Sequence, residues 1–117
     1  MRAAVFHGEG VVRLDDVPEP GVDADDDVVI EVEACGVCGT DLQILNVPPG
    51  HPADAGVVMG HEFIGRIASL GPVAAAGGLS LGQRVAVDPD PKCGVCRFCR
   101  AGRPANCENI AALGIFR

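Results

Sequence analysis

Four cysteines in the last third of the sequence have the spacing of a metal-binding cluster. Cys93, Cys96 and Cys99 follow one another every three residues, and Cys107 comes eight residues later. Structural zinc prefers four soft ligands in a tetrahedron, and thiolates are among the best of these ligands. With a cysteine at every vertex, no position remains for a substrate. The spacing therefore predicts a structural zinc site in a lobe of about residues 89–109.

The lobe has little besides a metal to hold it together. Val95 and Phe98 are its only sizeable apolar side chains. Structural zinc contributes about 10–16 kcal/mol in small peptides, which is enough to order such a segment. A four-thiolate iron site and a disulfide pair are the alternatives that the residues leave open.

A second group of possible ligands lies earlier in the chain. Taken alone, Cys35 and Cys38 could form a redox pair or half of a zinc site, and His61 could be a core histidine. Together with Glu62, they offer the cysteine, histidine and carboxylate ligands of a catalytic zinc that keeps one position open.

Composition limits the classes of protein to which the chain could belong. Its 117 residues suffice for one domain, and a hydrophobic fraction of 48% allows a core that must be mainly aliphatic, because aromatic residues make up only 3%. A net charge of -7 disfavours nucleic-acid binding. No secretory signal and no apolar run of roughly 20 residues is visible, so we expect a cytoplasmic protein without membrane contact. In that compartment, cysteines are more often thiolates or metal ligands than disulfides.

Short apolar segments separated by turns must position both groups of ligands. Residues 28–34 alternate, with Ile30, Val32 and Ala34 on one face, as in a half-buried strand. The glycine-rich stretch 71–82 is expected to be a turn, the aspartate-rich segment 23–27 a solvated loop and residues 113–117 the start of a strand. Regular spacing of strands predicts a mainly β fold. The other expected elements are strands at 2–6, 11–17, 62–70 and 83–88 and a short helix within 38–46.

Three motifs in order identify a resemblance to a known family. They are the segment Cys35–Asp41 (Cys-Gly-Val-Cys-Gly-Thr-Asp), the segment Gly60–Glu62 (Gly-His-Glu) and the four-cysteine lobe. With these motifs, the chain resembles the N-terminal part of the zinc-dependent medium-chain alcohol dehydrogenases, from Ala3 onward. The resemblance implies a GroES-like β-barrel with short helices, as one catalytic domain over residues 1–117, and its Gly-Thr-Asp form is similar to the polyol and threonine dehydrogenase branches.

The resemblance also implies roles for five residues. Cys38 and His61 are expected to bind a catalytic zinc, and Glu62 lies close to the metal and can be a ligand. Thr40 matches the hydroxyl that takes the proton from the bound alcohol, and Asp41 matches the carboxylate that orients the ligand histidine. The implied reaction converts an alcohol or polyol to a carbonyl, or the reverse, with NAD or NADP as the second cofactor beside two zinc ions.

Other positions depart from the family or match no role. Cys35 matches no ligand and is expected to be a small buried residue. Many relatives have a histidine where this chain has Gln43, which cannot relay a proton. His51 in the next loop could replace it, but a solvated loop histidine without this role is the favoured interpretation. A Rossmann domain is not present in the sequence, and neither is the third protein ligand of the catalytic zinc. We therefore expect the isolated chain to be inactive.

Two other classes of function remain as alternatives. One is a non-catalytic zinc module that serves as an interaction unit, in which Cys38 and His61 would be idle. The other is an electron carrier of the rubredoxin kind, built on the four-cysteine lobe. A co-chaperonin role would rest on fold analogy alone. Oligomers are common in the family, so the resemblance allows a homo-oligomer.

Overall fold

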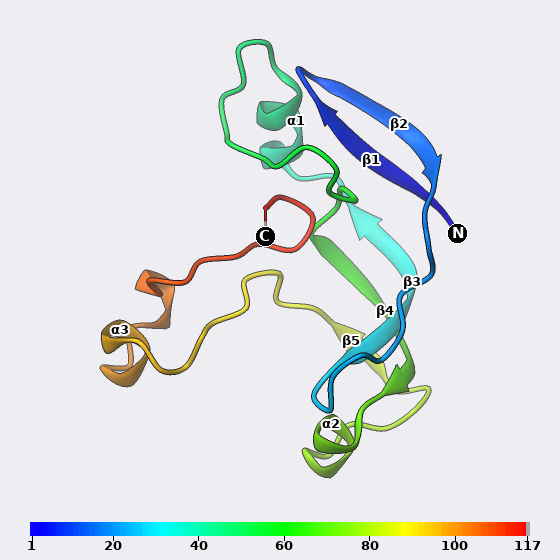
Figure 1. Ribbon diagram of the computed structural model, residues 1–117, viewed down its shortest axis with the longest axis vertical. Helices are drawn as coiled ribbons and strands as arrows, with labels where there is room; N and C mark the ends of the chain where they lie inside the picture. Colours follow the sequence, from blue (N-terminus) through cyan, green and yellow to red (C-terminus); the bar gives the residue numbers. More distant parts are fainter. Residues whose placement is uncertain (117) are drawn as a thin grey trace.

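The computed structural model describes residues 1–116, and Arg117, the last residue of the expected domain, lies outside this range. Five strands form two antiparallel sheets, and the helices between them are short (Figure 1). The expectation of a mainly β fold is confirmed. The strands are β1 (Arg2–Gly8) and β2 (Val11–Asp16) in one sheet, and β3 (Val28–Gly36), β4 (Glu62–Leu70) and β5 (Arg84–Ala86) in the other.

The first sheet is a hairpin that buries one of its two strands. β1 and β2 pair from Arg2 with Asp16 to Phe6 with Val12, and the tight turn between them contains Glu9 with a φ of 48°. Ala3, Val5 and Phe6 of β1 are buried, whereas β2 is mostly exposed. The hairpin therefore contributes to the core through β1.

The register of the second sheet brings distant parts of the sequence together. β4 lies in the centre, between β3 and β5, and β3 pairs with β4 up to the pair Gly36–Glu62. Because both residues lie at the end of their strands, the segment that follows Gly36 starts beside the segment that precedes Glu62. This register brings Cys38 into the neighbourhood of His61, although 22 residues separate them in the sequence.

The helices are α1 (Gly39–Leu45), α2 (Pro72–Ala76), α3 (Arg97–Arg100) and the 3-10 helix η1 (Pro104–Asn106). The helix expected within residues 38–46 is confirmed as α1, whereas the turn expected at 71–82 contains α2. Proline at the first position of α2 suits a helix start, and the carbonyl of Asp25 accepts a hydrogen bond from the Val73 amide at 2.9 Å. The segment 23–27 is largely exposed, as expected, and its backbone also caps a helix.

The C-terminal segment does not begin another strand. Residues 113–115 form a turn, closed by an antiparallel bridge between Ala112 and Phe116. The strand expected at 113–117 is therefore wrong within the described residues. Gly114 has a φ of 73°, a conformation that breaks a strand and that glycine adopts without strain.

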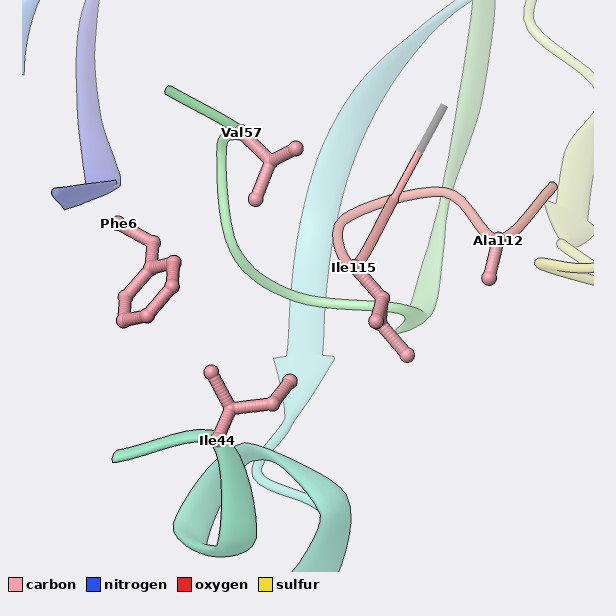
Figure 2. Close-up of a cluster of buried hydrophobic side chains, with 5 residues drawn as sticks. All are labelled: Phe6, Ile44, Val57, Ala112 and Ile115. Carbon is pink, nitrogen blue, oxygen red and sulfur yellow. The ribbon is translucent and has the colours of Figure 1, made fainter. Parts of the chain in front are cut away.

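The largest buried cluster joins the hairpin, α1 and this turn. Ile44 in α1 is 1% exposed, and it lies among buried side chains from three other parts of the chain. Figure 2 shows Ile44 pointing from the helix into the space between Phe6 and Ile115. The members of the cluster are Phe6, Ile44, Val57, Ala112 and Ile115.

One face of β3 is open instead of half-buried. Val32 is 53% exposed, and Ala34 is exposed as well, although the alternating pattern predicts that they pack inward. Val32 borders a broad groove of about 1150 Å³, which is lined by residues of β3, β4 and the segment before β4 and also by residues 1–3, 19–21 and 113–114. Among the described residues, no helix is long and apolar enough to cross a bilayer.

Candidate metal centres

The four cysteines of the lobe come together around one point. Cys96 lies at the start of α3, Cys99 lies inside it, and Cys107 follows η1. Their sulfur atoms all lie within 4.8 Å of one another. The lobe (yellow to orange) projects away from the sheets (Figure 1).

The distances between sulfur atoms fit a single ion better than a disulfide. The Sγ atoms of Cys93 and Cys107 are 3.5 Å apart, and those of Cys93 and Cys99 are 4.0 Å apart. Four sulfurs at about 2.3 Å from a zinc ion in a tetrahedron lie roughly 3.8 Å from one another. A disulfide requires about 2.05 Å. All six cysteines are free thiols, so the cluster has the size of a four-thiolate cage.

Backbone amides point at three of the four sulfur atoms. The amide of Cys96 donates to Cys93 Sγ at 3.4 Å, the amide of Cys99 donates to Cys96 Sγ at 3.5 Å, and the amide of Cys93 donates to Cys107 Sγ at 3.5 Å. Hydrogen bonds to the charged form of a group favour that form. The backbone fold of the lobe is therefore already suited to thiolates.

These hydrogen bonds change the acidity of the thiols. The amides of Cys99 and Glu108 lower the pKa of Cys96 to about 6, and the amides of Val95 and Cys96 lower the pKa of Cys93. Burial, together with the hydrogen bond to Cys96, raises the pKa of Cys99 to about 12. The backbone amides thus favour the thiolate form of Cys93 and Cys96, whereas burial disfavours it at Cys99.

Apart from the cysteines, the lobe has almost no core. Cys107 is the only buried residue between positions 89 and 109, and Val95 is 73% exposed. Arg97 lies over the Phe98 ring at 4.7 Å and pairs with Glu108 at 2.9 Å, both on the surface. Such surface contacts contribute little stability. The fold of this segment therefore depends on what the four sulfurs bind.

A second group of metal-ligand types forms where β3 leads into α1 and β4 begins. Cys38 precedes α1, His61 precedes β4, and Glu62 is the first residue of β4. Ligand atoms of these three residues lie within 4.8 Å of one another. The structure therefore brings together the cysteine, histidine and carboxylate that the sequence analysis selected.

Asp41 connects the two halves of this group. Its Oδ2 accepts a hydrogen bond from the Cys38 amide at 2.8 Å, and its Oδ1 lies 3.5 Å from Nδ1 of His61. Both residues are buried, and within residues 1–116 neither Asp41 Oδ1 nor His61 Nδ1 has a hydrogen-bond partner. Since Nδ1 faces the carboxylate, Nε2 is the nitrogen left for a ligand, as in metal sites where a carboxylate orients the histidine.

Thr40 and Glu62 lie at the edge of this group. The Thr40 hydroxyl lies 3.7 Å from the sulfur of Cys38 and is half-buried, whereas Glu62 is exposed. A thiolate, an imidazole and a carboxylate are ligands that suit zinc. A buried carboxylate behind the histidine, as Asp41 is here, is typical of the residues that orient a metal ligand. The residues present therefore fit a zinc ion.

Three other positions from the sequence analysis lie outside this group. Cys35 is exposed, so the expectation that it is buried is wrong: β3 leaves that face uncovered within the described residues. The His51 ring forms a hydrogen bond with the carbonyl of Pro52 at 2.8 Å. Gln43, in α1, contacts the loop that carries His51: its carbonyl accepts a hydrogen bond from the Gly50 amide at 2.9 Å.

Sequence reasoning missed two glycines that pack behind His61. Gly60 has a φ of 108°, and a Cβ at Gly114 would lie 2.2 Å from the carbonyl oxygen of Gly60. The glycine in the Gly-His-Glu segment was a visible signal for the first. Nothing in the sequence indicated that Gly114 lies against it.

The chain is similar in sequence to proteins of a known family. The family model described as "Alcohol dehydrogenase GroES-like domain" matches residues 24–117. An L-threonine 3-dehydrogenase of Xanthomonas axonopodis pv. citri (strain 306) is 41% identical over 101 residues, which are 85% of this chain and 28% of the relative. The chain thus spans less than a third of the length of this relative.

Solved structures give the same result for the fold. A protein of Sinorhizobium meliloti 1021, described as a zinc-binding dehydrogenase bound to NADP, superposes with a TM-score of 0.86 at 36% identity, over 99% of this chain and 32% of that one. Galactitol-1-phosphate dehydrogenase of Escherichia coli superposes with a TM-score of 0.88 at 27% identity, over 100% of this chain and 33% of that one. These matches confirm the GroES-like fold expected from the sequence.

Proposed function

The chain belongs to the family of alcohol dehydrogenase GroES-like domains, and we propose that it is the zinc-binding catalytic-domain part of an oxidoreductase. The whole enzyme would oxidise an alcohol or polyol to a carbonyl, or reduce the carbonyl, with NAD or NADP. The observation that carries this proposal is the group Cys38, His61 and Glu62 with the buried Asp41 behind it. Three protein ligands with an open fourth position are typical of catalytic zinc, whereas structural zinc sites have four protein ligands.

Each metal centre has its own role in this proposal. The four-cysteine lobe would hold a structural zinc through Cys93, Cys96, Cys99 and Cys107. Cys38 and His61 would hold a catalytic zinc, with Glu62 or water beside them and a further protein ligand from residues outside this sequence. A catalytic site needs such an open position for the substrate.

The residues around the second centre would bind and move a proton. When bound, zinc would supply Lewis-acid chemistry at an alcohol oxygen, and NAD or NADP would supply the hydride-transfer chemistry. Thr40, whose hydroxyl lies 3.7 Å from Cys38 Sγ, would take the proton of the alcohol. Asp41 would keep the His61 ring in the orientation that leaves Nε2 free. Gln43 cannot exchange a proton at neutral pH, so His51, in the adjoining loop, is the proposed outer relay.

Residues outside this sequence would supply the cofactor-binding part. The Sinorhizobium protein bound to NADP is about three times as long as the region that matches it, since this chain covers 32% of it. The apolar groove along β3 is a surface for such a part to cover. We therefore expect no steady NAD(P)-dependent oxidation of alcohol by the pure chain. A steady rate would contradict the proposal that residues outside this sequence bind the cofactor.

The names of the relatives support a class of substrate for this proposal. The L-threonine 3-dehydrogenase and the galactitol-1-phosphate dehydrogenase are named for substrates that carry hydroxyl groups. Their similarity to this chain supports a small alcohol or polyol as its substrate.

Zinc content tests the proposal directly. Elemental mass spectrometry of the chain, purified without added metal or chelator, should find about two zinc ions per chain, as two ligand groups imply. Cys96→Ser and Cys38→Ser should each remove about one. Cys35→Ser is the matched control and should remove none, because Cys35 belongs to neither ligand group.

Other outcomes separate the alternatives. About one zinc per chain that is insensitive to Cys38→Ser would leave the lobe intact and show that the Cys38–His61 centre depends on the ligand from outside this sequence. Iron instead of zinc, with visible absorbance, would favour the electron carrier. No metal at all, with six reactive thiols, would refute the proposal.

A further inference from the structure

The turn at residues 112–116 packs closely against the loop that carries His61. A Cβ built on Gly114 would lie 2.2 Å from the oxygen, 2.8 Å from the carbon and 3.0 Å from the nitrogen of Gly60. All three are backbone atoms of the residue directly before His61. In Figure 1 the red C-terminal turn lies beside the green segment that leads into β4. This contact is possible only because residue 114 has no side chain.

Gly60 is confined from its other side as well. A Cβ on Gly60 would lie 2.8 Å from the sulfur of Cys35, and its φ of 108° is a conformation that residues with side chains rarely adopt. The peptide before His61 thus lies between Cys35 of β3 and Gly114 of the turn. Its position leaves the His61 ring 3.5 Å from Asp41, in a contact without hydrogen-bond geometry.

The turn itself is anchored firmly. The Leu113 amide donates to the carbonyl of Pro89 at 2.9 Å, and the Asp54 amide donates to the carbonyl of Ile115 at 2.9 Å. Ala112 and Ile115 are 5% and 7% exposed within the core cluster. A Cβ at Gly114 would clash with Gly60. The turn could not move away to relieve this clash without breaking these contacts, so the Gly60 peptide would have to move instead.

We propose that Gly114 is a positioning residue for His61: the turn 112–116 holds the Gly60 peptide, and through it the imidazole, in the place where Nε2 meets a metal ion shared with Cys38. This inference rests on the proposed function, because it assumes that Cys38 and His61 bind a metal. Gly114 touches neither the metal nor a substrate. Its effect is exerted through backbone geometry alone.

Gly114→Ala, with Gly82→Ala as its control, tests the inference. The two glycines have nearly the same φ, 73° and 75°, so alanine introduces similar backbone strain at both positions. A Cβ at Gly82 meets nothing within 4 Å, whereas one at Gly114 meets Gly60. The difference between the variants therefore isolates the contact with Gly60.

The readout is metal binding at each centre of the full chain, not activity. Titration with zinc against a chromophoric chelator, with Cys38→Ser as the reference for the lobe alone, resolves the two centres. We expect Gly114→Ala to bind zinc at the Cys38–His61 centre about 10-fold or more weakly than wild type, the size of effect seen when groups behind a ligand are disturbed. The zinc affinity of the lobe should equal that of wild type in both variants. In Gly82→Ala, the zinc affinity of the Cys38–His61 centre should also equal that of wild type. Equal affinity of Gly114→Ala and Gly82→Ala at the second centre would overturn the inference.

A second measurement applies even if Gly114→Ala does not fold. Coupling between a metal and a contact is reciprocal, so metal at the second centre should protect the turn. Hydrogen exchange at the amides of Leu113 and Ile115 should be faster in zinc-loaded Cys38→Ser than in zinc-loaded wild type, and equal rates would overturn the inference. If wild type binds two zinc ions but these differences are absent, only the inference fails. If wild type takes no metal at Cys38 and His61, the proposed function fails and the inference fails with it.

Discussion

Asp41 contacts two ligand residues of the proposed second metal centre. One of its oxygens accepts a hydrogen bond from the Cys38 amide at 2.8 Å, and the other faces His61 Nδ1 at 3.5 Å. An anionic acceptor at that point favours a proton on Nδ1 and leaves Nε2 with a lone pair. A single carboxylate therefore controls both the backbone at one ligand and the tautomer of the other.

Asp41→Asn tests this role. The amide can still accept from the Cys38 amide, but its NH₂ group then faces Nδ1 and favours the tautomer with a proton on Nε2. We expect zinc affinity at the Cys38–His61 centre to fall by about 10–100-fold, as is typical when such a partner is removed. The lobe should be unaffected, as measured by competitive zinc titration. Asp90→Asn, an exposed aspartate beside Lys92, is the control, and an equal loss in both variants would argue against a specific role of Asp41.

At the scale of elements, α1 is held by packing rather than by its own stability. It has seven residues, too few for an isolated helix in water. Ile44, 1% exposed, anchors it against Phe6 and the 112–116 turn (Figure 2). Because Thr40 and Asp41 lie on the same short helix, loosening this anchor would also disturb the metal centre.

Ile44→Ala should therefore reduce both stability and metal binding. Loss of a fully buried aliphatic side chain costs about 2–5 kcal/mol in the free energy of unfolding. Leu42→Ala, on the same helix but 60% exposed, should change it by less than about 0.5 kcal/mol. Urea denaturation of the zinc-loaded chain measures the free energy of unfolding of each variant. A comparable loss in the two variants would contradict the role of Ile44 as the anchor.

At the scale of the whole molecule, the chain is more extended than its length requires. Its radius of gyration is 15.5 Å. A compact domain of this size would have about 13–14 Å. Two features account for the difference: the lobe projects from the sheets, and the groove along β3 is open (Figure 1). Cys107 is the one buried residue at positions 89–109. The lobe therefore has no apolar core of its own, unlike the sheets.

Metal removal should separate these two parts. With a strong zinc chelator, we expect residues 93–107 to lose protection from hydrogen exchange, because the lobe has no apolar core to replace the ion. Ile67, which is 2% exposed in the centre of β4, should keep its protection. Cys96→Ser without chelator should give the same pattern as chelated wild type. Unchanged exchange in the lobe after confirmed loss of zinc would show that the ion does not hold it.

The sequence by itself determined the local features of this protein. The four lobe cysteines lie within 15 consecutive residues, so their spacing alone predicted the cage that the structure contains. The strands expected at 2–6, 28–34 and 62–70 are present as β1, β3 and β4, and the helix expected within 38–46 is present as α1. The choice of Cys38, His61 and Glu62 relied further on the family resemblance, since residues so far apart carry no local signal of contact.

Only the tertiary structure decided the features that depend on contacts between distant segments. The pair Gly36–Glu62 in the β3–β4 register brings Cys38 to His61, and no local pattern specifies that register. The exposure of Cys35 and Val32 depends on which segments cover β3, whereas alternation predicts only that one face differs from the other. The contact of Gly114 with Gly60 joins residues 54 positions apart. Local sequence encodes backbone preference and ligand type, but which side chains and peptides meet is set by how the whole chain buries its few apolar groups.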